Sequence, residues 1–182
     1  MIPSSSTEVR RLTPPDWPVL KSLRLEALRD SPFAFLGNLI RESAKTSEQW
    51  VDLLNGQAWF AAFSAQQAVG LVSSLRDPLT DDRYVESMWV HVDHRGRGVA
   101  GLLLREVERL VLAESKPELR LWVLSGNDSA AVAYRRYGFR ESGRHQPVPD
   151  LPGVTETEFR LTIPSDRLLA TDAVVTSLSG GR

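Results

Sequence analysis

Apolar residues recur along this chain with two different periods, which predict helices and strands in turn. Between 99 and 115 they stand at positions 99, 103, 107, 110 and 111, the spacing of one helix face, and Pro117 would end that helix. Apolar and polar residues alternate at 119–123, which predicts a strand. A further helix is expected at 129–137, ended by Gly138.

The first half of the chain shows a different order of elements. The patterns predict a strand at 9–12, a helix that starts at Pro14 to Asp16 and ends at Arg29, a helix at 47–54, and strands at 58–64, 68–75 and 84–92. The last three strands are predicted to form an antiparallel meander. A strand, helix, strand, helix order after a meander predicts an α/β (α+β) fold, with a mixed sheet covered by helices.

Length and charge narrow the class of protein. A chain of 182 residues suits one domain, expected at 8–163, with a disordered tail at 1–7 and a tail at 164–182 that is flexible or forms an interface. Lys and Arg number 22 against 23 Asp and Glu, which argues against a nucleic-acid partner. No signal peptide or membrane-length apolar run is visible, so a cytoplasmic protein with no membrane partner is expected, as a monomer or homodimer.

A glycine-rich loop joins the strand at 84–92 to the helix that follows. Gly96 and Gly98 allow the backbone to approach a phosphate closely, Arg95 and Arg97 add positive charge, and the helix N-terminus supplies free N–H groups. A pyrophosphate is therefore the expected ligand. A dinucleotide fingerprint would need an acidic residue about 20 positions after the loop, where the chain reads Trp-Val-Leu-Ser, and no Gly-Lys-Ser/Thr of a Walker loop is present.

The histidines offer little chemistry of their own. The chain has three of them and no cysteine, which excludes disulfides and a cysteine nucleophile and gives no metal-ligand cluster at the usual spacing. His91 and His94 flank the glycine loop and are expected to face solvent or phosphate. His145 falls in a predicted loop.

Two motifs resemble those of a known family. Residues 95–100 resemble the Arg/Gln-x-x-Gly-x-Gly/Ala signature of the GNAT acyltransferases, at the strand-to-helix junction which that family uses. Residues 127–139 resemble the family's Asn-x-x-Ala-x-x-x-Tyr-x-x-x-Gly-Phe segment. The element order from about 9 to 161 is similar too, and the stretch 25–36 resembles a bacterial branch of the family.

The resemblance implies a fold and an acetyl-CoA site. The fold would be a mostly antiparallel sheet of six or seven strands with about four helices, splayed where the strand ending at His91 leaves the strand at 118–124, with the pantetheine arm between them. Main-chain groups near 88–90 would polarise the thioester carbonyl. The residues expected to bind acetyl-CoA are Met88, Trp89, Val90, Arg95, Gly96, Arg97, Gly98, Val99, Ala100, Gly101, Asn127 and Tyr134.

Two side chains are candidates for moving protons. Tyr134 matches the family's tyrosine and would protonate the departing thiolate, although a tyrosine with only a core role stays open. Glu86 is the candidate general base, because it lies two positions before Met88 and would share its strand face. A strand carboxylate at 86 that only faces solvent is one alternative, and a base that acts through water is another.

The pocket for the amine that receives the acetyl group is expected to have aromatic walls and a carboxylate. Such a pocket would suit a cationic amine with an apolar body. The favoured function is an acetyl-CoA-dependent N-acetyltransferase for a primary amine of a small molecule, such as a metabolite, amino acid or antibiotic. An enzyme acting on a protein N-terminus or lysine, and a non-catalytic acyl-CoA sensor, are the alternatives. The candidate acceptor residues are Phe33, Ala34, Phe35 and Leu36 between the first two predicted helices, with Trp50 of the second helix added, and Glu86, Glu156 and the loop 147–153 before the last strand. An ordinary core role for Phe33, Phe35 and Trp50 is the alternative.

Overall fold

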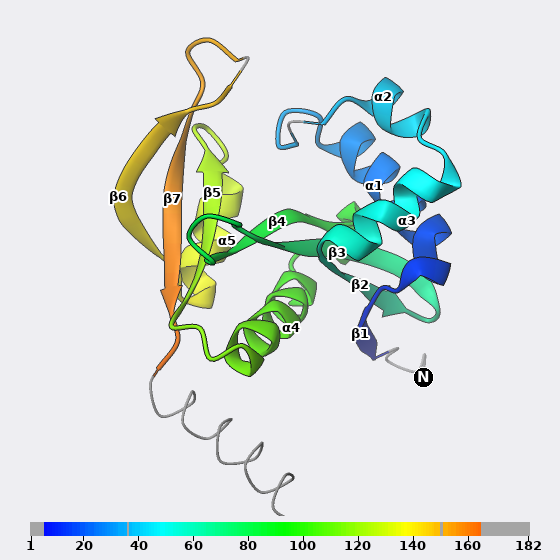
Figure 1. Ribbon diagram of the computed structural model, residues 1–182, viewed down its shortest axis with the longest axis horizontal. Coiled ribbons are helices and arrows are strands. Elements are labelled where there is room, and N and C mark those ends of the chain that lie inside the picture. Colours follow the sequence, from blue (N-terminus) through cyan, green and yellow to red (C-terminus); the bar gives the residue numbers. More distant parts are fainter. Residues whose placement is uncertain (1–5, 36, 150, 165–182) are drawn as a thin grey trace, which may run out of the picture. The chain divides into compact units, whose positions relative to one another are not determined.

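The computed structural model describes residues 6–35, 37–149 and 151–164 (Figure 1). The helices and strands follow in the order β1 (Thr7–Arg11), η1 (Pro14–Asp16), α1 (Trp17–Asp30), α2 (Leu39–Ser43), α3 (Ser47–Gly56), β2 (Ala58–Ser64), β3 (Gln67–Arg76), β4 (Arg83–Val90), η2 (Val92–His94), α4 (Val99–Ala113), β5 (Glu118–Leu124), α5 (Asp128–Tyr137), β6 (Arg140–Pro147) and β7 (Thr155–Thr162). Most of the two predicted tails, 1–5 and 165–182, lies outside the described residues, and Thr7, predicted in the N-terminal tail, is the first residue of β1.

The strands form one seven-stranded sheet in the order β1-β2-β3-β4-β5-β7-β6. Pairing is antiparallel between β1 and β2, β2 and β3, β5 and β7, and β6 and β7, whereas β4 and β5 run parallel. That parallel ladder covers only two residue pairs, Arg83 with Leu119 and Tyr84 with Arg120. The chain divides into two compact units, 1–75 with 86–107 and 76–85 with 108–182, and both β4 and α4 contribute to each.

In the first unit, helices and strands share an apolar core. Apolar residues three and four positions apart on α1, among them Leu20, Leu23 and Ala27, pack with Trp50 of α3 and Trp59 of β2. A capping box fixes the start of α3, since the N–H of Thr46 donates to the side chain of Gln49 at 3.0 Å, and the Thr46 hydroxyl accepts from the Gln49 N–H. Figure 1 shows α1, α2 and α3 gathered together. Trp50 is fully buried in this core, which agrees with the core role that was its alternative to acceptor binding.

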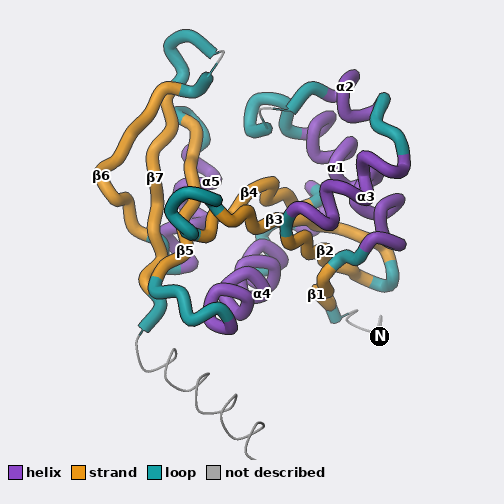
Figure 2. The backbone as a smooth tube through the Cα atoms, in the orientation of Figure 1, coloured by secondary structure: helices purple, strands orange, loops and turns teal. Residues whose placement is uncertain are grey.

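The second unit is built on β5, β7 and β6, which run side by side in Figure 2. Leu121 of β5 and Phe159 of β7 are opposite one another in the register and both are buried. α5 lies against this face, since the Arg135 guanidinium is 5.4 Å from the centre of the Phe159 ring. Gly138, with φ 129°, ends α5, and its N–H donates to the carbonyl of Tyr134 at 3.1 Å.

Two elements differ from the prediction. α2 spans only five residues, and it brings the α-helices in the described part of the chain to five. β6 occupies Arg140–Pro147, so the prediction that His145 lies in a loop is wrong. Pro147, predicted as the first residue of the loop before the last strand, is instead the last residue of β6. β6 is mostly exposed, and Gly143, with φ 82°, lies within a shift of its pairing register. For this reason the sequence shows no alternation of apolar and polar residues over this strand. No helix of the described residues has the length and apolar character that a membrane crossing requires.

Candidate active site

The glycine loop forms an open cradle in the first unit. Gly96 and Gly98 have φ of 71° and 81°, in the left-handed region, and a Cβ on either of them or on Gly101 would meet nothing within 4 Å. Within the described part of the chain, the N–H groups of 96–101 donate to no other protein group. Unpaired amides beside the N-terminus of α4 make this loop suited to an anion.

The two arginines of the loop have different surroundings. The guanidinium of Arg95 forms an ion pair with Asp30 at the end of α1, and its Nε donates to the carbonyl of Val90 at 2.9 Å. Asp30 also accepts from Trp89 Nε1 at 2.9 Å. Arg95 thus fastens the end of β4 to α1, while Arg97 is exposed and, among the described residues, has no partner. Arg97 is therefore the side chain of this loop that is available to a phosphate.

The Asp30 carboxyl is held in its ionised form. Desolvation by burial raises its pKa, but hydrogen bonds from Ser31, Trp89 and Arg95 outweigh that effect and leave the pKa below its ordinary value. A group with a lowered pKa in the folded state stabilises the fold above its unfolded pKa. Asp30 should therefore stabilise the protein at neutral pH and cease to do so in acid.

Asp30→Ala is expected to lower the free energy of unfolding at pH 7 by about 1 to 3 kcal/mol, because the buried indole N–H of Trp89 loses its acceptor. The deficit should shrink as pH falls below about 3.8, the ordinary pKa of an aspartate. Urea unfolding at pH 7 and pH 3 measures both. Asp93→Ala, at a side chain that is 80% exposed, is the control, and an equal loss in the two variants would contradict the role given to Asp30.

β4 has an irregular backbone at the point where chemistry is expected. Ser87 has φ 54°, a conformation that costs a non-glycine residue roughly 1 to 3 kcal/mol. The prediction that Glu86 and Met88 share a face assumed extended backbone between them, and Ser87 is not extended. Glu86 is exposed, and Met88 is partly buried.

Two of the histidines are held by neighbouring side chains. His91 Nδ1 accepts from the N–H of Asp93 at 3.2 Å, and His91 Nε2 lies 3.2 Å from Glu26 Oε1. His145 lies on β6, with Nδ1 at 3.0 Å from the hydroxyl of Thr157. The described residues contain no group of three or more acidic or histidine side chains arranged to hold a metal ion.

Tyr134 and Asn127 lie at α5 in the second unit. Asn127 caps this helix, with its Oδ1 accepting from the N–H of Ala130 at 3.3 Å. The Tyr134 ring is partly buried and meets Phe139 edge to face at 5.7 Å. Burial raises the pKa of the Tyr134 phenol above its ordinary value of 10, so the hydroxyl keeps its proton at neutral pH.

The candidate acceptor residues are not alike. Phe33 is 93% exposed, whereas the Phe35 ring lies 5.2 Å from the guanidinium carbon of Arg24. Leu36 lies outside the described residues. On β7, Glu156 accepts from Gln146 Nε2 at 2.6 Å. Each of these positions stays a prediction for acceptor binding.

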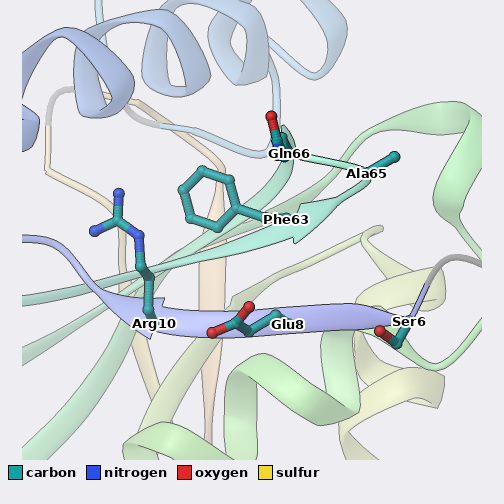
Figure 3. Close-up of a pocket in the computed structure, with 6 residues that line it drawn as sticks. All are labelled: Ser6, Glu8, Arg10, Phe63, Ala65 and Gln66. Atoms are coloured by element: carbon teal, nitrogen blue, oxygen red, sulfur yellow. The ribbon is translucent and has the colours of Figure 1, made fainter.

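A cavity of about 470 Å³ lies apart from the glycine loop, on the outer strands of the first unit (Figure 3). Arg10 stands in it with its guanidinium 4.8 Å from the centre of the Phe63 ring, and an ion pair of 2.7 Å ties the same group to Asp16. The cavity contains no predicted site residue. Its lining residues are Ser6, Glu8, Arg10, Phe63, Ala65 and Gln66.

Sequence reasoning missed the group of side chains that surrounds Ser87. Arg24 of α1 donates to Glu42 of α2 and to Ser87 of β4. These residues are 18 and 63 positions from Arg24, and no motif joins them. A glutamate on the five-residue α2 that is only 8% exposed is visible in the folded protein alone.

Comparison with known proteins agrees with this geometry. Residues 20–139 match the model of the acetyltransferase (GNAT) family. Similar solved structures include a GNAT-family acetyltransferase from Streptococcus pneumoniae (TM-score 0.72, 20% identity, 87% of this chain and 100% of that one) and a ribosomal-protein-alanine N-acetyltransferase from Brucella melitensis (0.67, 21%, 86% and 99%). A third is a ribosomal L7/L12 α-N-protein acetyltransferase in complex with coenzyme A (0.70, 16%, 89% and 97%).

At these identities the structures show a shared fold, while the family match spans more than half of the chain. The prediction of a mixed, mostly antiparallel sheet with one parallel pair and flanking helices is confirmed. With its glycine loop between β4 and α4 and its tyrosine on α5, this chain belongs to the acetyltransferase (GNAT) family.

Proposed function

We propose that this protein transfers the acetyl group of acetyl-CoA directly to a primary amine of a small molecule. The observation that carries the proposal is the cradle at 96–101, whose amides are unpaired among the described residues and whose glycines leave open space. Family membership supports acetyl transfer and acetyl-CoA as the donor. The proposal that the acceptor is a small molecule is argued from the contacts that Arg24 makes beside β4.

The residues of the cradle suit the pyrophosphate of acetyl-CoA. Gly96 and Gly98 would present backbone N–H groups, α4 would add the positive end of its dipole, and Arg97 would add a charge. Val99 and Ala100 would contribute amides of the first helical turn. Arg95 would act on the backbone that carries these groups, since its guanidinium is engaged with Asp30 and Val90.

Protons must leave the amine and reach the departing sulfur. Acetyl-CoA supplies a thioester whose carbonyl carbon is the electrophile. At pH 7, removing the proton that makes the amine cationic costs about 4.6 kcal/mol for an amine of pKa about 10.4. The same step costs about 1.4 kcal/mol for an amine of pKa about 8. Glu86, which is exposed, would accept that proton directly or through water.

Tyr134 would supply the proton for the sulfur. In water, transfer from a phenol of pKa about 10 to a thiolate of pKa about 8.5 is uphill by about 2 kcal/mol. Burial raises the phenol's pKa and so adds to that cost. Burial of the sulfur would also raise the pKa of its thiol, and this would offset the added cost of moving the proton from the phenol to the sulfur.

A contact across the acceptor segment supports a small acceptor. A polypeptide acceptor needs an extended groove. Here Arg24 joins α1, α2 and β4 by bonding Glu42 and Ser87, so these three elements are held together at that point. The exposed Phe33 and Ile40 favour the second candidate, a protein N-terminus, because they give that segment apolar surface for a chain to contact.

The test begins with thermal unfolding in the presence of acetyl-CoA, CoA or NAD. Either CoA species at 100 times its Kd should add about 2.7 kcal/mol and raise the midpoint by roughly 5 to 11 °C, and NAD should not. Thiol release from acetyl-CoA is then followed with amino acids, polyamines and aminoglycosides, and separately with peptides bearing a free N-terminus or one lysine. We expect release with small amines.

Each other outcome selects an alternative. Release with peptides alone would assign a protein acceptor, and a midpoint shift with no release for any amine would assign an acyl-CoA sensor. A shift with NAD alone would mean that the glycine loop does not bind CoA.

A further inference from the structure

Arg24 holds three elements of the first unit together. Its Nε lies 3.1 Å and 3.3 Å from the two carboxylate oxygens of Glu42, and its Nη2 lies 3.0 Å from Oε1. Its Nη1 donates to the hydroxyl of Ser87 at 3.1 Å. One planar guanidinium on α1 thus bonds a carboxylate on α2 and a hydroxyl on β4.

The ion pair is enclosed by the segment between α1 and α2. The side chains of Arg24 and Glu42 are 14% and 10% exposed. A Cβ on Gly37 would lie 2.8 Å from Glu42 Oε1 and 3.0 Å from Arg24 Nη2, so the backbone there packs directly on the pair. Asn38 caps α2 by accepting from the N–H of Arg41 at 3.1 Å, which fixes the short helix that carries Glu42.

Ser87 is the position where this support matters. A serine does not adopt φ 54° readily, and its hydroxyl is the group that Arg24 holds. The backbone torsions of residue 87 set the direction of every main-chain group that follows in β4. Those at 88–90 are the ones expected to engage the thioester carbonyl.

We propose that Arg24, oriented by Glu42, is a positioning residue that keeps Ser87 in its left-handed conformation and thereby aims the main-chain groups of 88–90. This inference rests on the proposed function. Arg24 acts through Ser87 and does not itself contact the reacting atoms. Glu42 acts one step further away, by fixing the plane of the guanidinium.

Glu42→Gln tests the proposal, with Glu114→Gln as its matched control. Glu114 forms a similar two-bond pair with Arg83, with Nε to Oε2 at 2.8 Å and side chains 11% and 24% exposed, but it lies in the other unit. Glu42→Gln should lower kcat about 10- to 100-fold and leave the acetyl-CoA Kd within about twofold. Glu114→Gln should change neither.

Two readouts do not depend on turnover. In the protein without ligand, hydrogen exchange of the amides at 86–90 should be about tenfold faster in Glu42→Gln than in the wild type. In the complex, the infrared carbonyl stretch of ¹³C-labelled acetyl-CoA should move toward its value in water. Glu114→Gln should leave both readouts at their wild-type values.

A second change provides a rescue. Glycine adopts a left-handed conformation without help, so Ser87→Gly added to Glu42→Gln should recover most of the lost kcat. Equal loss of kcat in Glu42→Gln and Glu114→Gln, or an unchanged carbonyl stretch, would overturn the proposal. Failure of the wild type to bind acetyl-CoA would instead overturn the proposed function, and the exchange measurement would still report on the role of Arg24.

Discussion

Replacing Tyr134 by phenylalanine is expected to lower kcat by at least about 100-fold, the usual contribution of a general acid. The change removes one hydroxyl and keeps the ring, whose edge-to-face contact with Phe139 at 5.7 Å would persist. Acetyl-CoA binding should therefore stay within about twofold. Turnover followed by thiol release, with Kd from calorimetry, separates the two quantities, and unchanged turnover would remove Tyr134 from the mechanism.

The pKa of the phenol supplies a control for the same variant. Because burial raises it above 10, the folded state holds this proton more tightly than the unfolded state does. Its contribution to stability is then complete below pH 10 and is lost as pH rises further. Between pH 9 and pH 11, the free energy of unfolding should fall less in Tyr134→Phe than in the wild type. A wild-type kcat that already falls at a pH below 10 because the phenol ionises would contradict the assignment.

Replacing Gly98 by alanine is expected to weaken acetyl-CoA binding by more than about 100-fold. A Cβ at this position would project into the open side of the cradle, where nothing lies within 4 Å. The loss of one or two hydrogen bonds to a charged phosphate corresponds to about 3 kcal/mol or more. Calorimetric titration with acetyl-CoA measures the change.

Gly143→Ala is the matched control for backbone strain. Gly143 has φ 82°, against 81° for Gly98, and it too has open space around a Cβ. Both variants should lower the unfolding midpoint by about 2 to 8 °C. Only Gly98→Ala should lose affinity, and a similar Kd for the two would show that the loop does not hold the ligand.

Where the hydrophobic pattern was regular, the sequence was enough to predict the element. β2 begins and ends where it was predicted, and the predicted helix at 99–115 is α4, whose Val99, Leu103 and Val107 are all buried. α2 is too short to show a period. β6 reads Arg-Glu-Ser-Gly-Arg-His-Gln-Pro, with no apolar residue to alternate.

The candidate site also has features that the sequence predicted and features that it did not. The glycine loop is contiguous in sequence, and its backbone conformation follows from the residue type, so it was predictable. The left-handed conformation of Ser87 was not, because serine rarely adopts it and its support comes from Arg24, 63 positions away. The ion pair of Arg95 with Asp30 spans 65 positions, and a basic residue in a glycine-rich loop gave no reason to expect it.

The surroundings of Arg95 give a physical reason for the two residue types that the family signature accepts at its first position. Arginine and glutamine differ by a full charge, so a position that served phosphate electrostatics would not treat them as equivalents. They share a planar nitrogen that donates a hydrogen bond, and in this protein that kind of nitrogen reaches the carbonyl of Val90. In this protein the position holds a flat donor that closes the end of a strand, and lysine, with the charge but without the planar group, would be the poorer substitute.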